Sequence, residues 1–375
     1  MAGIYIHIPF CLKACHYCDF HFSTNLSYRT EMTEMICQEI GLRKNYLRGA
    51  EIQTVYFGGG TPSILSNEDI DRIINEILKN FRLVTNLEIT LEANPEDLSA
   101  GYVRSLIGSG INRLSIGIQS FHDQTLASLN RCHTGEQALS GLVNARNAGI
   151  KNLSADIIFG IPGRTIAILK EDLDRLVSFC PEHISAYGLT IEEKTVFGKW
   201  SASGKFKPAS EEDHATEFEY LMEYLPEHGY DQYEISNFAR PGYESVHNSS
   251  YWKRIPYLGI GPGAHSFDGD NRHINISSNH IYMSSIHSGI PRIFTENLSK
   301  KDVVNEYLMT SLRLQEGCNL DFLAKDLNYD LAIIHKTYLD RLCLQGFAVI
   351  HSGQLQLTKK GKMIADQITG DLFCG

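Results

Sequence analysis

The sequence lacks a long uninterrupted apolar segment. Although 43% of its 375 residues are hydrophobic, it has no tract of about 18 consecutive apolar residues, the length typical of a membrane-spanning helix. The N-terminus also lacks a basic region followed by an apolar run, and residues 3 to 8 have the pattern of a strand, so we expect no secretory signal. These absences predict a soluble, cytoplasmic protein, large enough for one catalytic domain and an appendage.

Positive charge and a regular cysteine framework are also missing. The formal net charge of -10 leaves no basic surface to attract phosphates, so we expect no nucleic-acid partner. The nine cysteines are odd in number and irregular in spacing, which argues against a disulfide framework and favours metal ligands or inert thiols. We interpret the six that share no spacing as buried or incidental thiols: Cys37, Cys132, Cys180, Cys318, Cys343 and Cys374.

What the sequence does contain is a recurring unit of strand, loop and helix. The alternating apolar pattern predicts six strands, at about Gly3 to Ile8, Ile52 to Phe57, Leu87 to Glu92, Asn112 to Gln119, Asn152 to Ile158 and His183 to Thr190. Helical periodicity falls between them. This alternation predicts an α/β fold with a parallel sheet and right-handed crossovers.

The predicted strands have one apolar and one polar face. In the first strand Ile4, Ile6 and Ile8 alternate with Tyr5 and His7, whereas central strands of a doubly wound sheet are apolar on both faces. We therefore predict a partial (β/α)6 TIM-like barrel around a polar ligand; an open sheet with one wet face is the alternative. The active site of such a barrel lies at the carboxyl ends of the strands, the position of Glu92, Gln119 and Asp156.

We predict three regions along the chain. Residues 1–195 form the partial barrel, and residues 196–300 a barrel-completing extension with helical residues Glu211 to Gly229 and a strand at Gln232 to Asn237. Residues 301–375 form a small winged-helix-like domain, in which helical stretches precede a hairpin turning at Ser352-Gly353. From Lys301 onward eight basic residues face nine acidic ones, so packing on the main domain or on a protein partner is expected rather than DNA binding.

Three cysteines lie directly after the first strand. Cys11, Cys15 and Cys18 have the spacing C-x3-C-x2-C, which suits a [4Fe-4S] cluster with one iron left open for a bound molecule. A structural zinc ion is the alternative, with His7, His16 or His21 as the fourth ligand.

The stretch YIHIPFCLKACHYCDF resembles the signature of the radical S-adenosylmethionine (SAM) family. The ordered segments YFGGGTPSIL, LEANPEDL, RLSIGIQSF, LNRCHTG and DIIFGIPG are similar to the branch that contains oxygen-independent coproporphyrinogen III dehydrogenase and heme chaperones. The resemblance covers about residues 4 to 265. It implies that the three cysteines hold a [4Fe-4S] cluster and that SAM binds the open iron.

The resemblance also implies a set of SAM-binding residues. Glycine backbone allows close approach, an acidic side chain accepts from a ribose or an ammonium group, and the planar fork of an arginine suits a carboxylate. The expected residues are Tyr5, Tyr17 against the adenine, Gly59, Gly60, Thr61, Glu92, Gln119, Arg131 and Asp156.

Three features favour the heme-chaperone branch. Phe20 stands where the dehydrogenase branch has a further cysteine, the first strand begins at Gly3 without an extension before it, and HNSSYW matches an H-N-x-x-Y-W motif of the chaperones. In this motif His247 offers an imidazole to heme iron, and Tyr251 and Trp252 can stack on the porphyrin. His265, in a glycine-rich loop, is a second histidine of this kind.

The sequence therefore predicts a protein that binds heme and delivers it to acceptor hemoproteins, with an electron donor and with membrane association only through partners. The alternative is an enzyme of porphyrin biosynthesis that converts coproporphyrinogen III to protoporphyrinogen IX. A zinc-stabilised nucleic-acid adaptor is a third, more distant hypothesis. The sequence leaves open whether the SAM radical acts on a substrate.

Overall fold

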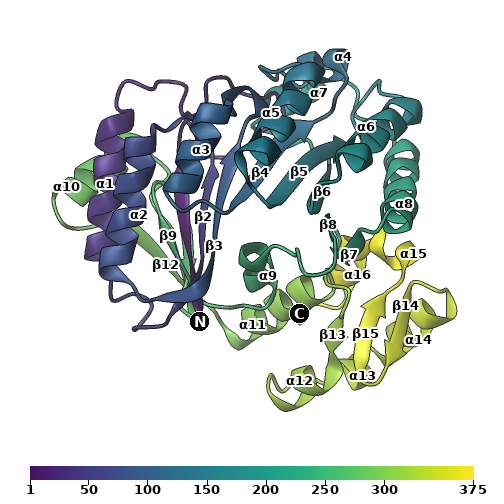
Figure 1. The fold of residues 1–375 in the computed structure, drawn as a ribbon. Coiled ribbons are helices and arrows are strands. Elements are labelled where there is room, and N and C mark those ends of the chain that lie inside the picture. The colour runs from purple at the N-terminus through teal and green to yellow at the C-terminus, as the bar shows by residue number, and fades with distance from the viewer.

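The computed structural model describes all 375 residues. A twelve-stranded sheet forms the main body, and a three-stranded sheet lies in a smaller C-terminal part, drawn in yellow and light green in Figure 1. The strand order of the large sheet is β12-β11-β10-β9-β1-β2-β3-β4-β5-β6-β8-β7.

The first six strands are parallel and pair in the order of the sequence. They are β1 (Ala2–Ile8), β2 (Ile52–Gly59), β3 (Leu83–Ala93), β4 (Arg113–Gln119), β5 (Asn152–Phe159) and β6 (His183–Gly188). Between them run α1 (Arg29–Leu42), α2 (Asn67–Asn80), α3 (Ala100–Gly108), α4 (Asp123–Ser128), α5 (Gly135–Ala148) and α6 (Ile166–Phe179). The predicted α/β partial barrel is thereby confirmed.

The helices cover one face of this sheet, as Figure 1 shows. Ile4, Ile6 and Ile8 of β1 are completely buried and share one hydrophobic core with Ile70 and Ile73 of α2. Since side chains alternate along a strand, this packing turns Tyr5 and the polar residues of the other strands to the opposite face.

Residues 196–300 add strands to both edges of the parallel sheet. β8 pairs antiparallel with β6, and β9 pairs parallel with β1, so the sheet stays open between β12 and β7. The elements are α7 (Val196–Ala202), α8 (Glu211–Glu227), β7 (Asp231–Glu234), β8 (Asn237–Ala239), α9 (Val246–Trp252), β9 (Tyr257–Ile260), β10 (His265–Phe267), β11 (Asn271–Asn275), α10 (Asn279–His287) and β12 (Ile293–Asn297).

Two sequence predictions for this extension need correction. The single strand expected at Gln232 to Asn237 is a pair of short antiparallel strands, β7 and β8. Residues 239–300, for which the sequence predicted no helix or strand, contain four strands and two helices. These strands have three to five residues each, too few to show an alternating pattern against the turns around them.

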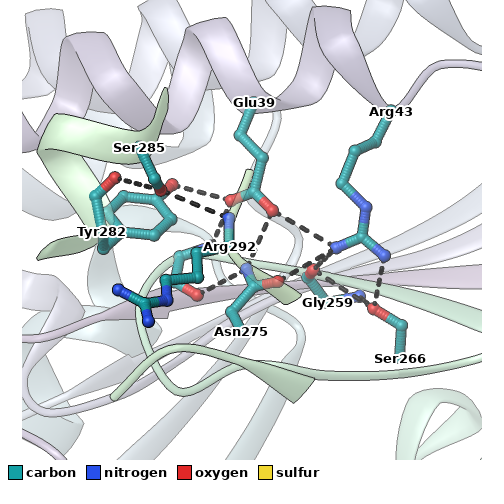
Figure 2. Close-up of polar contacts among 9 residues, drawn as sticks. Glu39, Arg43, Gly259, Ser266, Asn275, Tyr282, Ser285 and Arg292 are labelled. Carbon is teal, nitrogen blue, oxygen red and sulfur yellow. Dashed lines mark hydrogen bonds and ion pairs between the residues drawn. The ribbon is translucent and has the colours of Figure 1, made fainter. Parts of the chain in front are cut away.

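A buried polar cluster ties the added strands to α1 (Figure 2). The carboxylate of Glu39, which is completely buried, accepts from Arg43, from the Tyr282 hydroxyl at 2.7 Å and from the Asn275 amide at 2.8 Å. Arg43 also donates to the Ser266 hydroxyl at 3.1 Å. A buried charge needs such a full set of partners, so this cluster fixes the position of β10 and β11 against the first helix.

The C-terminal part has its own core of 15 buried residues. Its elements are α11 (Lys300–Ser311), β13 (Cys318–Asn319), α12 (Leu320–Lys325), α13 (Leu331–Ile334), α14 (Lys336–Leu344), β14 (Ala348–His351), β15 (Gln354–Leu357), α15 (Lys359–Lys362) and α16 (Ala365–Asp371). The hairpin turns at Ser352 and Gly353, which both have positive φ, as a two-residue turn requires. The boundaries at residues 195 and 300 stay predictions.

None of the helices combines the length and the apolar character that crossing a membrane requires.

Candidate functional site: two adjoining cavities

The first cavity, of about 420 Å³, opens at the carboxyl ends of the parallel strands. Most of the residues that the sequence suggested for the cluster and for SAM line it: Cys11, Cys15, Cys18, Tyr17, Gly59, Gly60, Thr61, Glu92, Gln119, Arg131 and Asp156. Tyr5 does not line this cavity. Its hydroxyl lies 3.2 Å from His7 Nδ1, in the wall of a second cavity.

The cysteine loop is closed at its base by two backbone hydrogen bonds, from Cys11 N to Ser23 O and from Ser23 N to Pro9 O. The Thr61 hydroxyl donates to Cys11 Sγ over 3.4 Å, and Arg131 donates to Cys15 Sγ over 3.5 Å. Burial raises the pKa of the Cys11 thiol to about 11 and that of Cys18 to about 12. These thiols therefore ionise only with strong positive charge beside them, such as that of bound iron.

The histidines considered as zinc ligands are engaged elsewhere. His7 Nε2 donates to His21 O at 2.8 Å, His16 Nδ1 donates to Ser128 O at 3.1 Å, and His21 Nε2 donates to Asn279 Oδ1 at 2.7 Å. No group of three or more His, Cys, Asp or Glu side chains is arranged to hold a single metal ion. The three thiols thus line the cavity without a histidine beside them that could serve as the fourth ligand of a zinc ion.

The glycine-rich turn after β2 packs closely behind the cysteine loop. A Cβ atom on Gly60 would meet Phe10 O at 2.5 Å, and one on Gly59, whose φ is 102°, would meet the His7 ring at 2.5 Å. Only glycine fits at these positions. The backbone of this turn is thereby exposed to the cavity beside Cys11.

Arg131 is the cavity residue best suited to an anion. Its Nη2 donates to Asn94 Oδ1 at 2.7 Å and to Gly117 O at 2.9 Å, which fixes the plane of the guanidinium. Its Nε is buried and has no hydrogen-bond partner. A buried donor without a partner is costly, and a ligand carboxylate would satisfy it.

Two carboxyl groups face the same cavity. The Tyr56 hydroxyl donates to Glu92 Oε1 at 2.7 Å, and burial raises the pKa of Glu92 to about 7, with the carboxylate of Asp156 adding to this effect. Asp156 accepts from the Ser115 hydroxyl at 3.0 Å and from Ser154 at 3.1 Å, and burial raises its pKa. Both groups are held as acceptors for a cationic or hydroxylated ligand.

Gln119 ends β4 in a strained conformation. Its φ of 65° is left-handed, and the register of β4 against β5 shifts between Gly117 and Gln119. Such conformations in residues other than glycine concentrate at functional sites. The irregularity brings Gln119 Nε2 close to Gly117 and into the cavity wall.

Several residues of this cavity were not among those that the sequence suggested. Tyr56 and Ser115 lie on the polar faces of β2 and β4, where strand alternation could have indicated them. Asn94 lies within a motif that was noted, but its contact with Arg131 is tertiary. Asn248 comes from α9, about 130 residues beyond Gln119 in the sequence, and no local signal could have placed it in this wall.

A second cavity, of about 550 Å³, adjoins the first, and Asp19 and Phe20 line both. Tyr5, Tyr251, Trp252 and His265 lie in its wall, together with Arg254, Arg272 and Met309. The side chains come from β1, α9, the strands β9 to β11 and the C-terminal helix α11. Tyr251, Trp252 and His265 were suggested for heme from the sequence, whereas Arg254, Arg272 and Met309 were not.

The motif histidine, His247, lines neither cavity, so its role as an iron ligand stays a prediction. Only 1% exposed, its ring pairs through Nδ1 with the Thr54 hydroxyl and through Nε2 with the Tyr251 hydroxyl, both at 2.8 Å. Burial lowers its pKa to about 3. With both nitrogens engaged, His247 anchors α9 to β2 and orients Tyr251.

Comparisons with known proteins agree with this geometry. Residues 5–176 match the model of the radical SAM superfamily, and residues 298–364 match that of the HemN C-terminal domain. The heme chaperone HemW of Bacillus subtilis (strain 168) is 33% identical over 373 residues, which cover 99% of this chain and 98% of that protein.

The chain belongs to the HemW family.

A second HemW relative and one solved structure extend the comparison. HemW of a Synechocystis strain is 36% identical over 84% of this chain and 78% of its own length. The structure of the coproporphyrinogen III oxidase HemN from Escherichia coli has a TM-score of 0.85 at 22% identity, over 99% of this chain and 90% of that one. At this identity the likeness shows the shared fold. The family predicted from the sequence is confirmed.

Proposed function

We propose that this protein is a heme chaperone of the radical SAM type, which binds heme and delivers it to acceptor hemoproteins. Relatives from Bacillus subtilis and Synechocystis carry that name. The observation that carries the proposal is the second cavity beside the cysteine cavity, because its wall combines imidazole, aromatic and guanidinium groups. These are the groups that suit an iron, a flat ring and carboxylates, respectively.

In the first cavity, Cys11, Cys15 and Cys18 would ligate three irons of a [4Fe-4S] cluster. Arg131, through its unpartnered Nε, would bind the methionine carboxylate of SAM, and Glu92 and Asp156 would accept from its ammonium and ribose groups. Gln119, Thr61 and the Gly59-Gly60 backbone would complete its polar contacts, and Tyr17 would pack on the adenine. When bound and reduced, the cluster supplies the electron that cleaves the sulfonium of SAM.

The proposal includes an acceptor hemoprotein and an electron donor as partners, a cytoplasmic location, and contact with a membrane only through a partner. Its alternative is the oxidative decarboxylation of coproporphyrinogen III. The side chain at position 20 favours the chaperone: Phe20 is 65% exposed at the boundary of the two cavities, where the dehydrogenase branch has a cysteine.

Two assays on the reconstituted, anaerobic protein test the proposal. The first titrates hemin and follows the Soret band, then adds an apo-hemoprotein such as apomyoglobin; the chaperone hypothesis expects saturable binding followed by transfer. The second supplies SAM, a reductant and coproporphyrinogen III. Formation of protoporphyrinogen IX, or the absence of heme transfer, would contradict the chaperone function.

A further inference from the structure

The wall of the second cavity combines aromatic and positively charged side chains. Trp252, Tyr257 and Phe267 contribute aromatic surface, and Arg254 and Arg272 contribute two guanidinium groups. A cavity of about 550 Å³ is within the size range of cofactor sites. This combination suits a flat apolar molecule that also carries anionic groups.

The two guanidinium groups share a single carboxylate. Arg254 and Arg272 both pair with Glu306 of α11, and their Cζ atoms lie 5.0 and 5.4 Å from the centre of the Phe267 ring. Arg254, Arg272 and Glu306 together therefore carry a net charge of +1. This net positive charge can attract an anionic group of a ligand.

Three imidazoles line the cavity, and they differ in their partners. His7 contacts the Tyr5 hydroxyl through Nδ1 and His21 O through Nε2, and His21 contacts Asn279. His265 is exposed to the cavity, and its ring makes no hydrogen bond or ion pair with the protein. It is therefore the imidazole whose two nitrogens are both available to a metal.

The strand that carries His265, β10, is fixed by hydrogen bonds on the face opposite to the cavity. Ser266, the next residue of β10, accepts from Arg43 at 3.1 Å within the buried cluster of Figure 2. Because neighbouring side chains of a strand point to opposite faces, this anchor directs His265 and Phe267 to the cavity face. A metal ligand needs such a fixed support.

We infer that heme binds in the second cavity, with His265 as the axial ligand of the iron and with its propionates directed to Arg254 and Arg272. This inference rests on the proposed chaperone function and assigns its ligand to a site. A ring nitrogen of His265 donates its lone pair to the iron in place of a water molecule, so no electron is transferred. The helix α11 contributes Glu306, Met309 and Thr310 to the site, which makes the C-terminal part a wall of the heme cavity.

Hemin titration of His265→Ala, His265→Gly and wild type tests the inference, with the Soret band and the electron paramagnetic resonance (EPR) spectrum of the ferric heme as readouts. We expect His265→Ala to weaken binding by about tenfold or more and to remove the spectral signature of axial histidine. Imidazole added to His265→Gly should restore that signature, which a purely structural role would not allow. Arg272→Gln should weaken binding without changing the axial-ligand spectrum.

The matched control is His351→Gln, which removes an exposed imidazole from β14, outside both cavities; it should bind heme like the wild type. If wild type binds heme while His265→Ala keeps its affinity and spectrum, the inference is overturned and the chaperone function stands. If the wild type binds no heme, both the inference and the proposed chaperone function are overturned.

Discussion

The two cavities are built from different kinds of structure. The first lies where successive parallel strands end, so the last residues of β2 to β6 and the loops that follow β1 to β6 supply nearly all of its wall. The second takes its wall from β1, α9, β9 to β11 and α11, segments separated by up to about 300 residues. A repeated strand-and-helix unit places functional residues at regular points of the sequence, whereas packing between distant segments leaves no such pattern.

The boundary between the cavities consists of few residues. Asp19 and Phe20, directly after the third cysteine, line both. The helix α9 lies between the two as well, since Asn248 faces the first cavity while Tyr251 and Trp252 face the second. We therefore expect substitutions in one cavity to leave ligand binding in the other largely intact, and the following predictions test this separation.

The largest effect is expected for Cys11→Ser, Cys15→Ser or Cys18→Ser. Each removes one thiolate ligand, so reconstituted protein should lose nearly all of its [4Fe-4S] content, measured by iron analysis and by EPR after reduction. Cys343→Ser, on the remote helix α14, is the control and should keep its cluster. Hemin binding should persist in all four variants; its loss in the cluster variants would show that the cavities do not act separately.

Arg131→Lys should weaken SAM binding by about 10- to 100-fold, since lysine keeps the charge but not the planar fork that a carboxylate needs. Isothermal titration calorimetry with SAM measures the change. Arg175→Lys, at an exposed position of α6, serves as the control. An unchanged SAM affinity for Arg131→Lys would remove this residue from the site.

Glu92 should make SAM binding depend on pH. Because burial raises its pKa to about 7, the carboxyl is mostly protonated at pH 6 and ionised at pH 8, and only the ionised form attracts an ammonium group. The SAM affinity of the wild type should rise over this interval by up to about tenfold, whereas that of Glu92→Gln should change little. Equal pH profiles for the two proteins would contradict this role.

The free energy of unfolding of the ligand-free protein should fall between pH 6 and pH 8, whereas its SAM affinity rises. A carboxyl whose pKa is higher in the folded state than in the unfolded state stabilises the fold at low pH, and this contribution is lost as the pH rises through about 7. Thermal melts at pH 6 and pH 8 should therefore show a larger loss of stability for wild type than for Glu92→Gln. The exposed Glu136→Gln should melt like the wild type at both pH values.

The smallest effect is expected for Tyr251→Phe. Loss of the hydroxyl leaves His247 Nε2 buried without its partner, which should lower the free energy of unfolding by about 1 kcal/mol. Urea denaturation measures it, with the exposed Tyr243→Phe as the control. The axial-ligand spectrum of bound heme should be unchanged. A changed spectrum would favour His247, rather than His265, as the ligand of the iron.

Much of the first cavity could be predicted because local rules act there. The six strands begin and end within a few residues of their predicted bounds, and eleven of the suggested residues lie in its wall. Two suggested residues do not line this cavity, and the reasons are tertiary. Tyr5 faces the second cavity, and His247, in a motif that suggested a ligand, is closed off by Thr54 of another element.

By itself, the sequence determined the parallel sheet, the cysteine loop and the residues at the strand ends, because side-chain alternation and strand direction follow from local chain geometry. Only the tertiary structure decided which histidine is available to a ligand. The availability of an imidazole depends on the partners that distant segments bring to its nitrogens: Thr54 and Tyr251 occupy both nitrogens of His247, and the ring of His265 has no such partner. The three thiols after β1 could be recognised from eight residues of sequence. The cavity beside them exists only because β9 pairs with β1, β10 and β11 extend that edge of the sheet, and α11 packs near α9.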